Sequence, residues 1–150
     1  MRPVLTALVA GLAAALAAAP AAAEDAAPEL EVITPGEDNP LATFKWEKRP
    51  VVVFADSELD PRFERQMREL RQYAAEMVER DVVVIVDTTP GPDRFDTTPL
   101  REELRPRDFT LILIGKDGGV KLRRPNVQTA RELMRAIDRM PMRQQEMGRR

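Results

Sequence analysis

The chain has 150 residues, a formal net charge of −2 at pH 7, and neither cysteine nor histidine. Their absence excludes disulfides, thiol redox chemistry, thiolate and imidazole metal sites, and catalysis by Ser-His-Asp or Cys-His groups. The near-neutral charge gives no reason to expect nucleic acid or an anionic membrane surface as a partner. What remains is the composition of an ordinary soluble domain that is long enough to bury a sizeable core.

The first residues have the pattern of an export signal. A basic start at Arg2 precedes an uncharged stretch, rich in Ala, Leu and Val, that runs from Val4 and ends in three alanines. Small residues suit a signal peptidase, so we predict a signal peptide over residues 1–23 with cleavage between Ala23 and Glu24. The destination would be periplasmic or secreted, and the excess of Arg over Lys fits a GC-rich bacterial genome. The alternative is an uncleaved membrane anchor, because the stretch is just long enough to span a bilayer.

Residues 24–40 are rich in Ala, Pro, Glu and Asp, and so little apolar surface does not offset the entropy of ordering. We therefore predict a mobile leader there and one domain over residues 41–147. The domain opens with Leu41, Phe44 and Trp46, the only tryptophan. We interpret these side chains as cover for one edge of the core; the alternative is an exposed aromatic for ligand stacking.

Two apolar runs, Val51–Ala55 and Val82–Val86, predict parallel strands covered on both faces. A helix is predicted between them, with Asp60 as its cap and Pro61 as its first residue. Its apolar stripe comprises Phe63, Met67, Leu70, Ala74 and Met77. Strand, helix and strand therefore form a βαβ unit.

The second half begins with a loop over residues 88–98 and a short helix from Thr98-Pro99 to near Arg105. Two strands follow, Phe109–Ile114 and Val120–Arg123, joined by the tight turn Gly115–Gly119. A last helix is predicted to be capped by Asn126 and stopped or kinked by Pro141, with its apolar stripe formed by Ala130, Leu133, Met134 and Ile137.

This order predicts an α/β, thioredoxin-like fold. Its mixed four-stranded sheet would combine a parallel βαβ pair with an antiparallel hairpin, flanked by helices. The redox site of such a fold follows the first strand, and Phe54–Pro61 carries no thiol there. The proline that usually precedes the third core strand is also missing, since Asp108-Phe109-Thr110 stands at that junction. Oxidoreductase and peroxidase activities are therefore not expected.

The chain resembles the bacterial exported proteins grouped as domain of unknown function 4174, which are similar to a domain of animal secreted matrix proteins. The resemblance covers about Leu41 to Met147 and implies a thioredoxin-like domain without a demonstrated activity. It rests on Trp46, Arg49–Ala55, Gln66, Glu79–Val84, Leu113–Arg123, Ile137-Asp138 and Met140–Gln144.

Four polar residues are predicted at the carboxyl edge of the parallel strands: Asp56, Ser57, Asp60 and Asp87. Such a group suits a hard cation or a carboxylate acid/base pair. Helix capping by Asp60 and solvation of strand ends explain the same residues, and we favour that interpretation. No catalytic, cofactor or metal assignment follows from it.

The hairpin is basic, with Lys116, Lys121, Arg123 and Arg124. Its Gly115–Gly119 turn lacks the spacing of a phosphate loop, so we interpret it as a turn. The basic side chains form either a binding face or, more simply, a solvated edge that deters strand pairing.

Three methionines near the C-terminus, Met140, Met142 and Met147, offer soft thioether ligands for copper(I). Packing of the last helix, or an adaptable apolar contact surface, is the simpler interpretation.

We therefore predict an exported, redox-inactive binding or interaction module whose partner is a periplasmic or envelope protein. The alternatives are a cysteine-independent enzyme at the carboxyl edge of the sheet and copper handling by methionine.

Overall fold

The protein is described by a computed structural model that covers residues 28–88 and 97–150. The predicted signal peptide and its cleavage site lie outside the described residues, as does most of the predicted loop 88–98. The described residues form one five-stranded sheet in the order β1-β3-β2-β4-β5. The strands are β1 (Val32–Ile33), β2 (Arg49–Phe54), β3 (Val82–Asp87), β4 (Thr110–Ile114) and β5 (Val120–Arg124).

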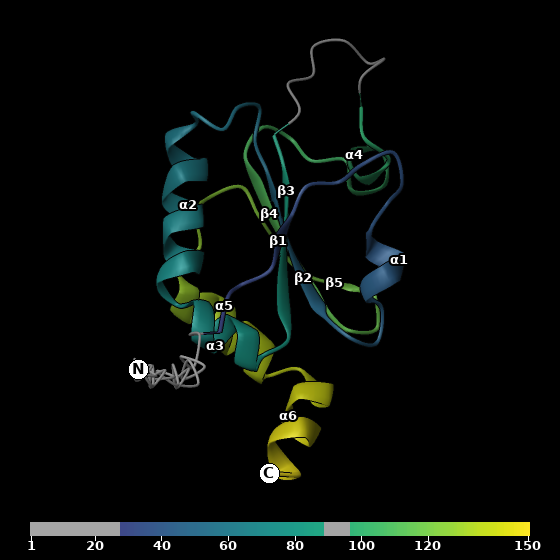
Figure 1. The fold of residues 1–150 in the computed structure, drawn as a ribbon, viewed down its shortest axis with the longest axis vertical. Helices are drawn as coiled ribbons and strands as arrows, with labels where there is room; N and C mark the ends of the chain where they lie inside the picture. Colours follow the sequence, from purple (N-terminus) through teal and green to yellow (C-terminus); the bar gives the residue numbers. More distant parts are fainter. Residues whose placement is uncertain (1–27, 89–96) are drawn as a thin grey trace, which may run out of the picture.

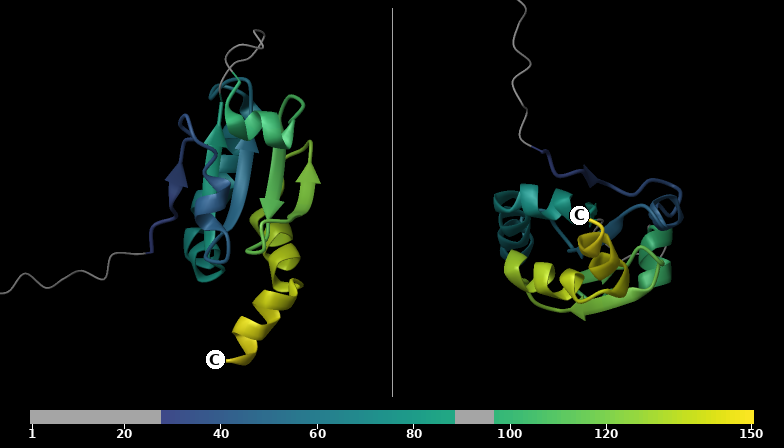
Figure 2. Two further views of the ribbon diagram at one scale, coloured as in Figure 1. Left: turned by 90° about the vertical axis from the view of Figure 1, so that its right-hand side faces the viewer. Right: turned by 90° about the horizontal axis from the view of Figure 1, so that it is seen from below.

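Six helices accompany the sheet in the described part of the chain: α1 (Leu41–Phe44), α2 (Pro61–Gln72), α3 (Ala74–Glu79), α4 (Pro99–Leu104), α5 (Ala130–Asp138) and α6 (Pro141–Gly148). Helices α2, α3 and α5 cover one face of the sheet, and α1 and α4 lie against the other (Figure 1). Helix α6 projects from one end of the molecule (Figure 2).

The two valine runs, β2 and β3, lie at the centre of the sheet. Their residues are apolar on both sides because helices cover both faces of the sheet. Strand β2 pairs in parallel with β3, where Val51 lies opposite Val84, and antiparallel with β4, where Val52 lies opposite Ile112. Every residue of β2, β3 and β4 is buried. Two apolar clusters, one on each face, result from this arrangement.

The predicted four-stranded sheet is wrong by one strand. Val32 and Ile33 pair in parallel with Val84 and Ile85, within the segment assigned to a mobile leader. The preceding Leu30 is buried, and the Glu31 carbonyl accepts a hydrogen bond from the Val84 amide at 2.9 Å. Two residues are too few to show the alternation of apolar and polar side chains that predicts a strand. The strand forms because Val32 and Ile33 pair with the free edge of β3.

Local details of the predicted helices also differ. The long first helix is interrupted at Tyr73, whose φ of −113° and ψ of 35° separate α2 from α3. The cap of α5 is Thr129, not Asn126: its hydroxyl accepts from the Glu132 amide, and the Glu132 side chain accepts from the Thr129 amide. This reciprocal capping box satisfies two backbone N–H donors, those of Thr129 and Glu132. The prediction of Asn126 as the cap overlooked this Thr-x-x-Glu pattern.

Trp46 does not cover the core as predicted. Its side chain is 61 % exposed, and its φ of 71° is rare for a bulky residue. Leu41 and Phe44 do pack against the cluster beneath α1 and α4. Within residues 28–88 and 97–150, no helix is both long and apolar enough to cross a membrane.

Candidate binding site at the base of the sheet

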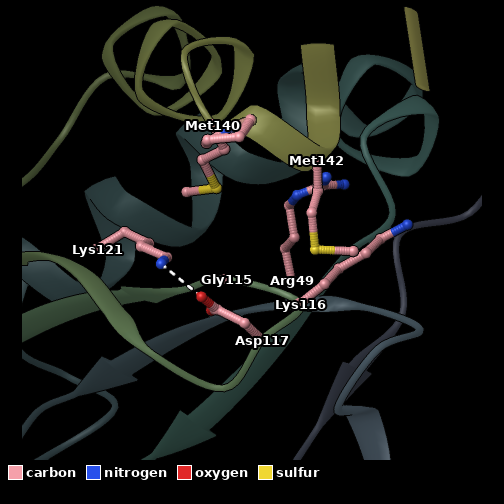
Figure 3. Close-up of a pocket in the computed structure, with 8 residues that line it drawn as sticks. Arg49, Gly115, Lys116, Asp117, Lys121, Met140 and Met142 are labelled. Carbon is pink, nitrogen blue, oxygen red and sulfur yellow. Dashed lines mark hydrogen bonds and ion pairs between the residues drawn. The ribbon is translucent and has the colours of Figure 1, made fainter. Parts of the chain in front are cut away.

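A pocket of about 170 Å³ lies at the end of the sheet where β2 and β3 begin, which we call the basal end. Three separate parts of the chain meet there: the start of β2, the β4–β5 hairpin and the start of α6 (Figure 3). The lining of this basal pocket comprises Arg49, Gly115, Lys116, Asp117, Lys121, Met140, Pro141 and Met142. It thus unites the hairpin and the methionine-proline-methionine sequence, whose nearest lining residues, Lys121 and Met140, are 19 positions apart in the chain.

Arg49 occupies the first position of β2 and has no exposed surface. Its guanidinium donates to the Arg80 carbonyl at 2.9 Å and to the Glu146 carboxylate at 3.0 Å. Its Nε finds no acceptor among the described residues. A buried cation is tolerated only when it is paired, so Glu146 makes this position of Arg49 possible.

Glu146 also accepts from the ammonium of Lys116, at 2.8 Å, and the same ammonium donates to Asp81 at 2.7 Å. Burial opposes the ionisation of Glu146, but the hydrogen bonds from Arg49 and Lys116 outweigh it and lower the pKa of the carboxyl to about 2. Helix α6 is therefore fastened both to β2 and to the hairpin.

A second buried cation, Arg143, fastens the first turn of α6 to α3 and α5. It donates to the Glu79 carboxylate at 3.1 Å and contacts the Asp138 carboxylate at 3.4 Å. Arg80 binds the same Asp138 with two hydrogen bonds of 3.0 Å each. Burial opposes ionisation of Asp138, yet these arginines lower the pKa of its carboxyl. A network of charged groups thus connects α6 to β2, the hairpin, α3 and α5.

The hairpin turn supplies the other wall of the pocket. Asp117 accepts from the Gly119 amide at 3.0 Å and from the Lys121 ammonium at 2.8 Å, the interaction drawn in Figure 3. A Cβ at Gly115 would lie 2.6 Å from the Lys121 side chain, and Gly118 has a φ of 81°. Gly118 is therefore required for its backbone conformation, whereas a side chain at Gly115 would displace the side chains of Lys121 and Asp117. The interpretation of this segment as a turn is supported.

Three exposed apolar residues occur close in the chain, or by a backbone hydrogen bond, to residues that line the pocket. The Trp46 amide donates to the Lys116 carbonyl at 2.6 Å, which places the tryptophan beside the hairpin. Val120 directly follows the turn and Met147 directly follows Glu146; they are 49 % and 42 % exposed. A bulge between Leu113 and Ile114 disturbs the pairing at the end of the hairpin where Val120 lies.

The four residues predicted at the carboxyl edge of the parallel strands have separate structural roles and do not form one site. Asp60 caps α2, accepting from the Arg62 amide at 2.8 Å, and the hydrogen bond from the Arg62 side chain lowers the pKa of its carboxyl. Asp87 is wholly buried and bonds to Arg101 at 3.0 Å and to the Thr98 hydroxyl. Asp56 is exposed.

Ser57, also exposed, accepts from the Leu59 amide at 3.1 Å. Capping by Asp60 agrees with the favoured interpretation, and so does the exposure of Asp56. The predicted solvation of Asp87 at its strand end is wrong, because Asp87 is buried and paired with Arg101. No group of three or more acidic residues suited to a metal occurs in the part of the chain that the structure describes.

The predicted basic face is divided. Lys116 and Lys121 line the basal pocket, whereas Arg123 donates to the Leu104 carbonyl at 2.7 Å, at the other end of β5. The methionines are divided as well, because Met140 and Met142 line the pocket and Met147 does not. Sequence reasoning missed Arg49 and Glu146 as site residues. Two signals pointed to Arg49: its position beside a buried strand and its place in the Arg49–Ala55 segment of the family resemblance.

The fold and the site define a class: a thioredoxin-like domain that has neither thiol nor histidine and keeps a preformed pocket at the base of its sheet. The chain belongs to the family described as "Domain of unknown function (DUF4174)", whose model matches residues 40–146. No curated protein sequence matches it.

Similar solved structures support the fold. Chloroplastic thioredoxin z is 28 % identical to this chain, with a TM-score of 0.54. The match covers 73 % of this chain and 91 % of the thioredoxin chain. A reduced 2-Cys peroxiredoxin of Plasmodium vivax is 15 % identical, with coverages of 71 % and 84 % and a TM-score of 0.53. The peroxiredoxin Prx1a of Plasmodium yoelii is 13 % identical, with coverages of 70 % and 80 % and a TM-score of 0.51. The predicted thioredoxin-like fold is confirmed, and the absence of cysteine is consistent with redox inactivity.

Proposed function

We propose that this chain is an exported, redox-inactive binding module that holds a periplasmic or envelope protein at its basal end. In this proposal the basal pocket receives one apolar side chain of the partner. The observation that carries it is the pocket itself, which lies between the hairpin and α6, where Glu146 forms ion pairs with Arg49 and Lys116. Arg49 and Lys116 lie in segments on which the family resemblance rests. The position of the usual redox site holds instead the exposed Asp56 and Ser57 and the helix cap Asp60.

The dimensions of the pocket support a single side chain as its occupant. An apolar cavity of roughly 150 Å³ is large enough for a benzene molecule, and the basal pocket has about 170 Å³. Thioether side chains adapt to partners of different shape, and Met140 and Met142 provide two of them. Exposed Trp46 adds the kind of aromatic anchor that carries much of the energy in protein interfaces.

The ligand set disfavours the copper alternative at this place. Copper(I) prefers soft ligands such as thioether sulfur, and the other charged side chains of the lining are three cations and the carboxylate of Asp117. With Met147 outside the lining, only two thioethers would be left to hold the ion.

The fold itself is compatible with recognition of proteins. Chloroplastic thioredoxin z, which shares it, is described as defining a type-specific target recognition. The enzyme alternative has less support, because the structure holds Asp87 in a buried ion pair with Arg101 and leaves Asp56 at the surface.

Capped tripeptides with a central Leu, Phe or Asp test the proposal by amide NMR on the chain without residues 1–23. We expect saturable shifts with Leu and Phe, centred on the Gly115–Gly119 turn and the start of α6, and much weaker ones with Asp. Met142→Trp should fill the pocket and abolish these shifts, whereas Met147→Trp, outside the lining, should preserve them. Shifts at Asp56 and Ser57 instead would support the enzyme alternative and overturn the proposal.

A further inference from the structure

We propose that a second site, a hollow lined by three arginines, binds a tetrahedral oxyanion of the phosphate class. The hollow has a volume of about 310 Å³ and lies beside α4, away from the basal pocket. Its lining comprises Arg105, Arg107, Thr110, Arg123 and Pro125, and it contains no carboxylate. We call it the arginine hollow.

The chain positions these arginines through its backbone. Arg123 projects from edge strand β5 and donates to the Leu104 carbonyl at 2.7 Å. Arg105 ends α4 in the left-handed conformation, with a φ of 46°. The Thr110 hydroxyl donates to the Arg107 carbonyl at 2.8 Å and so fixes the loop that carries Arg107.

Arg105, Arg107 and Arg123 are exposed, and what sets them apart is that all three line one hollow without a carboxylate. Each buried or half-buried arginine described above, including Arg49, Arg101 and Arg143, forms an ion pair with a carboxylate. Within residues 28–88 and 97–150, neither Arg105, Arg107 nor Arg123 forms one.

The acidic residue nearest in sequence to Arg107 is already engaged elsewhere. Asp108 accepts two hydrogen bonds from Arg62, at 3.0 and 2.8 Å, and these lower the pKa of its carboxyl. It therefore does not neutralise the hollow, and three like charges remain around one concavity.

The chemistry of guanidinium specifies the ligand. A guanidinium presents a planar set of N–H donors that matches two oxygens of a phosphate or sulfate, and these charge-assisted hydrogen bonds are stronger than neutral ones. Three such groups around one hollow suit an anion with several equivalent oxygens. A tetrahedral oxyanion would also relieve the repulsion among the three arginines.

Inorganic phosphate and pyrophosphate are the first probes, titrated at constant ionic strength while the arginine Nε–H NMR signals are followed. We expect saturable shifts of the Arg105, Arg107 and Arg123 signals. The double variant Arg105→Gln/Arg107→Gln should weaken pyrophosphate binding about tenfold or more. Arg139→Gln removes an exposed charge at the end of α5 and should change it less than twofold.

Vesicles distinguish the source of the phosphate group. Binding to phosphatidylglycerol vesicles but not phosphatidylcholine vesicles, lost in the double variant, would assign the hollow to a lipid headgroup. Binding of the free anions alone would assign it to a soluble phosphate compound. The proposal is overturned if neither probe produces saturable shifts of the three signals, or if Arg139→Gln weakens binding as much as the double variant does.

Discussion

Arg49 and Glu146 lie 97 positions apart in the sequence and are joined by a hydrogen-bonded ion pair of 3.0 Å. The arginine is fully buried at the start of β2, and the glutamate lies on α6 with about a quarter of its side chain exposed. Since α6 forms one wall of the basal pocket, this pair connects the core of the sheet to the proposed binding site.

Glu146→Gln should destabilise the protein, because it leaves the buried charge of Arg49 and the ammonium of Lys116 with one less anion. Breaking a buried pair costs roughly 3–5 kcal/mol, and we expect about 2 kcal/mol here because Glu146 is partly exposed. Urea denaturation measures the change. Glu58→Gln, an exposed loop residue, is the matched control and should change stability by less than about 0.5 kcal/mol. Equal effects of both substitutions would contradict the role given to Glu146.

Acid should remove the same contribution. The pKa of Glu146 is lowered to about 2 in the folded protein from 4.5, so its stabilising effect is complete above pH 4.5 and is lost as the pH falls towards 2. The difference in unfolding free energy between the wild type and Glu146→Gln should therefore shrink over that range. A difference that stays constant from pH 5 to pH 2 would show that the carboxylate charge is not what stabilises α6.

The carboxyl edge should behave as a structural element. Asp87→Asn breaks the buried pair with Arg101 and should cost about 3 kcal/mol. Asp56→Asn, at an exposed position, should cost less than about 0.5 kcal/mol. Both variants, where folded, should bind the Phe tripeptide like the wild type. Loss of that binding in folded Asp56→Asn would favour a functional site at this edge.

Copper(I) titration tests the methionine hypothesis. Because only two thioethers line the pocket, we expect weak binding that is the same in the wild type and in Met140→Leu/Met142→Leu. A tight one-to-one complex that disappears in the double variant would reverse this conclusion.

Local patterns predicted much of the fold. The valine runs of β2 and β3 and the turn Gly115–Gly119 agree with the structure because adjacent residues determine them. The Pro61 start of α2 and the Pro99 start of α4 were predicted for the same reason. Strand β1 was not, since Val32 and Ile33 gain their conformation only by pairing with β3.

The candidate site was less predictable than the fold. Lys116, Met140 and Met142 were singled out separately, but nothing in their spacing places them around one pocket. The pairing of Arg49 with Glu146 depends on how α6 turns after Pro141, which is a tertiary property. Likewise, the convergence of Arg105, Arg107 and Arg123 requires the packing of α4 against the hairpin.

Methionine methyl NMR tests the binding of an apolar side chain at the basal pocket most directly. Met140 and Met142 line the pocket, whereas Met67 and Met77 are buried in the core on the face covered by α2 and α3 and serve as internal controls. On titration with the Phe tripeptide, we predict that the methyl signals of Met140 and Met142 shift and saturate while those of Met67 and Met77 stay fixed. Unchanged signals of Met140 and Met142 at concentrations that shift any other part of the protein would contradict the account.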